Sequence, residues 1–109
     1  MSTQITVKEL LARIKNNQPV LILDVRDEEK YNTGTLVLEN TENRNIPFVA
    51  MRDGEEKAVK QLASLPSDTP IVTVCTSGNK AQKAAAFLQE KGFQALSLEG
   101  GLTAWKENS

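Results

Sequence analysis

The sequence contains no histidine and only one cysteine among its 109 residues. Without histidine, the chain cannot build Ser-His-Asp or Cys-His catalytic machinery. One cysteine without histidine also leaves the usual zinc ligand sets incomplete, and we expect neither a metal nor a cofactor. A lone cysteine cannot form an internal disulfide, which fits a reducing compartment. Any cysteine chemistry must therefore depend on backbone amides, a helix N-terminus or a lysine.

Long apolar runs and an excess of one charge are missing as well. The apolar run at 20–23 is far too short to span a bilayer, and the first residues lack the basic-then-apolar order of a signal peptide. The formal net charge is −1, so we expect neither a nucleic acid nor a membrane as a partner. The lack of a signal-peptide pattern predicts a cytoplasmic protein. Length and composition predict a single globular domain over residues 1–109, and the oligomeric state stays open.

Apolar patterning predicts strands that alternate with helices. Continuous apolar runs at 20–25 and 71–74 and the alternating run at 95–98 predict strands, and the first two are expected to be covered on both faces. Thr6 and Glu9 form a capping-box pattern. The predicted helices are 7–16, a short turn at 27–31, 53–65 with Val59, Leu62 and Ala63 on one face, 81–91, and a last short helix that carries Trp105. The polar segment 39–45 is expected to be a loop, and 46–48 a short edge strand.

This alternation predicts an α/β fold with a mostly parallel central sheet and helices on both faces. Ligands of such folds bind at the carboxyl ends of the strands. Cys75 directly follows the predicted strand at 71–74 and stands at such an end.

The stretch from Ile71 to Ala81, IVTVCTSGNKA, places a tight polar turn between a strand and a helix. This order would direct the amide groups of residues 76–80 toward one point, at the positive end of the following helix. Gly78 permits a backbone conformation that other residues avoid, and Lys80 adds a positive charge. A thiolate at Cys75 would be stabilised there. The alternative is a small buried cysteine that ends a strand, and the local pattern does not decide between them.

Three sequence motifs, taken together, favour a functional role for Cys75. The segments LILDVRDEEKYNTG (21–34), VCTSGNKA (74–81) and LEGGLTAW (98–105) together resemble the rhodanese family of sulfurtransferases. The resemblance implies the rhodanese-like three-layer sandwich and a catalytic Cys75 that is displayed and not buried. Cys75 would accept sulfane sulfur as a persulfide from thiosulfate, polysulfide or a thiol persulfide, and pass it to a thiol or to cyanide. The implied substrate-binding residues are Thr76, Ser77, Gly78, Asn79 and Lys80. Arg26 is a separate candidate for the rim of the pocket.

The sequence departs from the family pattern at the loop and upstream of it. Active family members commonly carry arginine at the positions of Thr76 and Lys80, and arginine can grip an oxyanion through two parallel hydrogen bonds. The family's Gly-His-Ile element reads here as Gly34, Thr35 and Leu36. Thiosulfate is therefore expected to be a poorer donor than a thiol persulfide.

Other functions for a loop cysteine fit less well. A phosphatase or arsenate reductase needs arginine six residues after the cysteine, where this chain has Ala81. A thioredoxin-like role needs a second cysteine. The remaining alternative is a non-catalytic or weakly catalytic rhodanese module that carries sulfur or binds a partner protein. Structural roles are expected for Asp24 paired with Arg26, for the turn at 99–101 and for Trp105 in the core.

Overall fold

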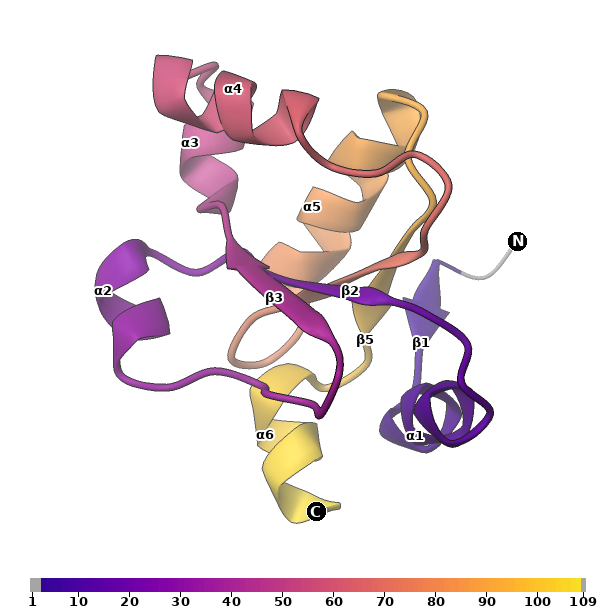
Figure 1. The fold of residues 1–109 in the computed structure, drawn as a ribbon. Helices are drawn as coiled ribbons and strands as arrows, with labels where there is room; N and C mark the ends of the chain where they lie inside the picture. The colour runs from indigo at the N-terminus through magenta and orange to yellow at the C-terminus, as the bar shows by residue number, and fades with distance from the viewer. Residues whose placement is uncertain (1–2, 109) are drawn as a thin grey trace.

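The computed structural model describes residues 3–108, so residues 1, 2 and 109 of the predicted 1–109 domain lie outside the described part (Figure 1). The strands are β1 (Gln4–Ile5), β2 (Leu21–Asp24), β3 (Glu42–Asn45), β4 (Ile71–Val74) and β5 (Ala95–Leu98). The helices are α1 (Val7–Lys15), α2 (Glu28–Asn32), α3 (Phe48–Arg52), α4 (Glu56–Ala63), α5 (Asn79–Glu90) and α6 (Gly101–Glu107). The predicted capping box is present, since Thr6 accepts from the Glu9 amide and Glu9 accepts from the Thr6 amide.

The five strands form one sheet in the order β1-β5-β4-β2-β3, and every neighbouring pair is parallel. The three strands predicted from apolar runs are adjacent at its centre. This arrangement confirms the predicted α/β class. It also brings the carboxyl ends of β2 and β4 side by side, because Asp24 pairs in register with Val74.

Two apolar clusters cover the two faces of the sheet. Side chains alternate along each strand, so Leu21 and Leu23 of β2 join the cluster beneath α3, α4 and α5, whereas Ile22 joins the cluster beneath α1 and α6. Figure 1 shows the same division of the helices. Cys75 falls on the α5 side of this alternation. Among residues 3–108, no helix is long and apolar enough to cross a membrane.

Two predictions in the middle of the chain are wrong. Strand β3 is the polar segment 42–45, which was expected to lie in a loop, and Phe48 of the expected 46–48 strand begins α3 instead. β3 is an edge strand paired only with β2, and its side chains are exposed or half-buried. Because the strand buries little side-chain surface, its sequence can be polar. The two-residue β1 was not predicted from the sequence.

The helix predicted over 53–65 is wrong in its bounds and partly wrong in its inner face, where Leu62 packs against the core as predicted. Asp53 and Gly54 separate α3 from α4, and Gly54 has a φ of +69°, in the left-handed region that glycine tolerates. On α4, Ala58 is the buried residue, while Val59 is 51% exposed. Each residue of an α-helix is rotated by about 100° from the one before it. Because Ala58 faces the core, the next residue, Val59, points outward.

Candidate active site

The candidate site is the loop that joins β4 to α5, and its centre is the sulfur of Cys75. The backbone amides of Gly78 and Ala81 donate to Cys75 Sγ, at N···S distances of 3.0 and 3.3 Å. The sequence predicted donors from residues 76–80, so Ala81 is an addition from just beyond that range. Two N–H groups directed at one sulfur would stabilise negative charge on it.

The prediction that Cys75 is displayed and not buried is wrong in terms of exposed surface. Only 4% of the residue is accessible, because the loop closes around the sulfur. Cys75 nevertheless lines a surface cavity of about 230 Å³, which opens among the loop residues. The thiol is therefore enclosed by amide donors and reached through this cavity.

The N-terminus of α5 supplies further donors next to the thiol. Gly78 is the N-cap residue and has a φ of +104°, which agrees with its predicted conformational role. The first hydrogen bond inside the helix runs from the Gln82 amide to the Gly78 carbonyl, at 3.0 Å. The amides of Asn79 and Lys80 precede this bond, so no carbonyl of α5 accepts from them. They are available to an anion in the cavity.

The first turn of α6 holds the other side of the loop. The Leu102 amide donates to the Cys75 carbonyl at 2.8 Å, and the Thr103 amide donates to the Thr76 carbonyl at 3.1 Å. Gly101 lies so close that a Cβ atom on it would be 2.3 Å from the Cys75 carbonyl oxygen. The turn at 99–101 thus has the structural role that the sequence predicted. Trp105 is half-buried and packs against the core, as also expected.

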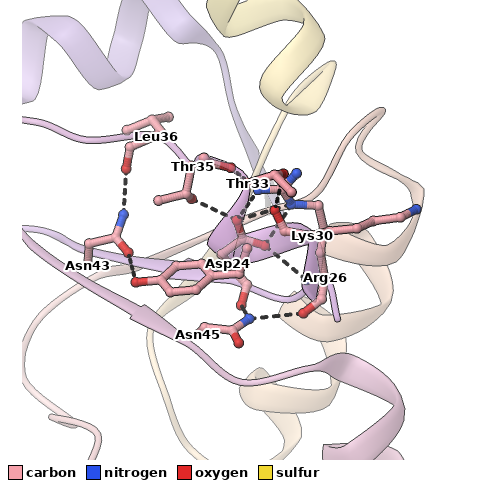
Figure 2. Close-up of polar contacts among 10 residues, drawn as sticks. Asp24, Arg26, Lys30, Thr33, Thr35, Leu36, Asn43 and Asn45 are labelled. Carbon is pink, nitrogen blue, oxygen red and sulfur yellow. Dashed lines mark hydrogen bonds and ion pairs between the residues drawn. The ribbon is translucent and has the colours of Figure 1, made fainter. Parts of the chain in front are cut away.

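A buried polar network lies beside the site and includes Arg26, which lines the cavity of Cys75. Asp24 is fully buried, and its carboxylate accepts from Arg26 Nε and Nη2, the shortest distance being 2.7 Å. Thr35, at the family's histidine position, donates to Asp24 Oδ2 at 2.7 Å. The Asn45 side chain donates to the carbonyls of Asp24 and Arg26 (Figure 2). The predicted pairing of Asp24 with Arg26 is therefore present.

The cavity brings together the predicted site residues except Gly78, and it adds one residue that was not predicted. It is lined by Arg26, Lys30, Cys75, Thr76, Ser77, Asn79 and Lys80. Arg26 is among these lining residues, and its guanidinium is engaged by Asp24 and by the Gly34 carbonyl. Lys30 on α2 was not singled out from the sequence, where it falls in the short turn predicted at 27–31. The resemblance includes this segment but assigned no role to Lys30.

Comparisons with known proteins agree with this geometry. The family model described as Rhodanese-like domain matches residues 6–108. The protein named thiosulfate sulfurtransferase GlpE of Pseudoalteromonas translucida is 36% identical over 93 residues, covering 84% of this chain and 77% of the relative. A crystal structure of a rhodanese-like domain protein from Staphylococcus aureus superposes with a TM-score of 0.73 and 28% identity, over 96% of this chain and 91% of that one.

A strand-to-helix loop around a single cysteine, on a parallel α/β sheet, defines the class of the molecule. The chain belongs to the rhodanese-like domain family. It also matches part of a much longer maize protein, "Adenylyltransferase and sulfurtransferase MOCS3-2", at 29% identity over 98% of this chain. The chain spans 22% of the length of that relative.

Proposed function

We propose that this chain is a sulfurtransferase that moves sulfane sulfur from thiosulfate, polysulfide or a thiol persulfide to a thiol or to cyanide, through a persulfide on Cys75. The observation that carries the proposal is the enclosure of Cys75 Sγ by the Gly78 and Ala81 amides at the floor of a cavity with a cationic lining. The names of relatives such as thiosulfate sulfurtransferase GlpE support the same chemistry. The cytoplasmic location stays a prediction.

In the proposed reaction, the Cys75 thiolate attacks the outer sulfur of the donor. A new S–S bond forms to Cys75, and the donor's own S–S bond breaks, its electron pair leaving with sulfite or with a thiolate. With thiosulfate, a thiolate and a dianion give a persulfide anion and sulfite, so charge and atoms balance. An acceptor thiolate or cyanide then takes the terminal sulfur and regenerates the Cys75 thiolate, which predicts ping-pong kinetics.

The loop amides would serve both steps without a general base. The nucleophile reacts as a thiolate, so no histidine is required to remove a proton. The free amides of Asn79 and Lys80 would hold the donor anion first and the extended persulfide afterwards. Preorganised donors of this kind stabilise a developing anion by about 3 kcal/mol each. The side chains of Thr76 and Ser77 would contribute neutral hydroxyls to the same anion.

Sulfur loading of Cys75 is the first testable prediction. After incubation with thiosulfate, polysulfide or glutathione persulfide, we expect at least one donor to leave the intact protein heavier by one sulfur atom. The Cys75→Ser variant should gain no mass, because serine cannot hold sulfane sulfur. Subsequent cyanide should return the wild type to its original mass and release thiocyanate. Intact mass spectrometry measures both steps.

The alternative function is a non-catalytic or weakly catalytic module that carries sulfur or binds a partner protein. Threonine at position 76, where active family members commonly carry arginine, and the 4% exposure of Cys75 favour this alternative. If no donor changes the mass of the wild type, or if Cys75→Ser gains the same mass, the sulfurtransferase proposal fails and the binding module replaces it.

A further inference from the structure

We propose that Lys30 is a specificity-determining residue that selects sulfur donors with a carboxylate away from the transferred sulfur. Persulfides of thiol amino acids or thiol peptides are donors of this class. The inference rests on the proposed sulfurtransferase function and assigns a role to a residue outside the cysteine loop. It concerns how the donor is recognised, and the transfer step remains the one described above.

The charge of the cavity is the first observation. Its lining contains three cationic residues, Arg26, Lys30 and Lys80, and no carboxylate, although the whole chain has a net charge of −1. Asp24 neutralises Arg26. Within residues 3–108, neither Lys30 nor Lys80 forms an ion pair. The cavity therefore offers two uncompensated positive charges from two different elements, one from α2 and one from α5.

Two hydrogen bonds to other segments hold α2, and with it Lys30, beside the site. Arg26 Nη2 donates to the Gly34 carbonyl at 2.6 Å, which holds the chain just beyond α2. The Tyr31 hydroxyl donates to Asn43 Oδ1 on β3 at 2.7 Å, which holds the helix itself. Figure 2 shows the Lys30 side chain extending away from this network, and Lys30 lines the cavity of Cys75.

The size of the cavity favours a donor larger than thiosulfate. Its volume of about 230 Å³ equals the share of roughly eight water molecules in the liquid, at about 30 Å³ each. Thiosulfate has only five heavy atoms and leaves much of this space to water. A persulfide with an amino-acid or peptide body fills more of it, and its terminal sulfur can reach Cys75 while a carboxylate lies near Lys30.

The chemistry of lysine fits this role. A lysine ammonium is a point charge on a flexible stem, with no fixed direction for its partner. It can therefore meet a carboxylate whose position varies among donors, whereas an arginine in the loop would grip an oxyanion beside the cysteine. In this chain the neutral Thr76 stands at that loop position. Lys30 supplies the second positive charge from outside the loop.

The first experiment measures the charge at Cys75 without sulfur transfer. Cys75, the only cysteine, is alkylated with anionic iodoacetate and with neutral iodoacetamide, and the ratio of the two rates is taken. Both reagents need the same thiolate, so the ratio reports the local potential. We expect Lys30→Gln to lower the ratio about two- to five-fold, the effect of one nearby charge in a partly solvated site. Lys83→Gln, an equal charge change at an exposed α5 residue outside the cavity, should leave it unchanged.

The second experiment compares two persulfide donors that differ in the charge of their bodies. Loading rate constants of Cys75 are measured by intact mass with glutathione persulfide and with the persulfide of 2-mercaptoethanol. We expect Lys30→Gln to lower the constant for glutathione persulfide about five-fold, and to leave that for the neutral-bodied donor within two-fold. Lys30→Arg should restore the preference for glutathione persulfide, and Lys83→Gln should affect neither donor.

The outcomes separate this inference from the proposed function. If both donors lose the same factor in Lys30→Gln, or if neither loses any, Lys30 does not select donors and the inference is wrong, while the sulfurtransferase proposal stands. If neither donor loads the wild type, the transfer function fails for these donors. The alkylation ratio then decides the inference, because an unchanged ratio in Lys30→Gln shows that Lys30 does not act at Cys75.

Discussion

Replacing Gly101 with alanine is expected to lower the free energy of unfolding by about 3 kcal/mol or more. The new Cβ atom would be 2.3 Å from the Cys75 carbonyl oxygen, 2.7 Å from the Thr76 carbonyl oxygen and 2.9 Å from the Gly78 nitrogen. All three are backbone atoms, so no side-chain rotation relieves the overlap. The cysteine loop and the start of α6 would have to separate. Urea unfolding of wild type and variant measures the difference.

Gly54→Ala is the matched control for Gly101→Ala. The two glycines have similar left-handed backbone angles, with φ of +69° at Gly54 and +60° at Gly101, but a Cβ atom at Gly54 meets nothing within 4 Å. Alanine at Gly54 should therefore cost only the conformational strain, about 1 kcal/mol. Equal losses in the two variants would show that the close approach of Gly101 to the loop is not needed. A Gly101→Ala protein that loses its cooperative unfolding transition would agree with the prediction.

The contact between Gly101 and the cysteine loop could not be predicted from the sequence. The strands β2 and β4 could be predicted because a strand buried on both faces needs an apolar run. The burial of Cys75 could not, because it depends on the turn at Gly101, which is distant in the sequence. Nothing in the local pattern around Cys75 reports how closely that turn approaches. The loop could thus be located from the sequence, but its degree of closure could not.

β3 and Lys30 escaped prediction for a related reason. The polar side chains of β3 have specific partners: Asn43 joins Tyr31 to the Leu36 carbonyl, and Asn45 binds the carbonyls at the end of β2. A strand that stabilises a loop in this way has the composition of a loop. In the sequence, Lys30 likewise does not differ from any surface lysine. Its place at the site depends on the position of α2, which the Asp24 network holds. The strand β3 and the position of Lys30 both depend on hydrogen bonds between segments, and hydrophobic periodicity does not predict such bonds.

Replacing Asp24 with asparagine is the second change with a large expected effect. The carboxylate is fully buried, and the Arg26 side chain paired with it is only 12% exposed. Asparagine keeps the shape but removes the charge, so the guanidinium remains partly buried without a counter-ion. Removing one partner of a buried pair costs about 3 kcal/mol or more, and we expect a loss of about 3 kcal/mol in urea unfolding.

Asp53→Asn is the matched control, because it removes the same charge from an exposed pair. Arg52 and Asp53 are 3.0 Å apart with side chains 57% and 50% exposed, and such pairs contribute at most about 1 kcal/mol.

Asp24→Asn should also reduce the preference for glutathione persulfide, since the network that positions α2 and Lys30 is weakened. Stability losses of similar size in the two variants would contradict the structural role of the Asp24 network. A large loss of stability with an unchanged donor preference would mean that Lys30 reaches the cavity without help from Asp24.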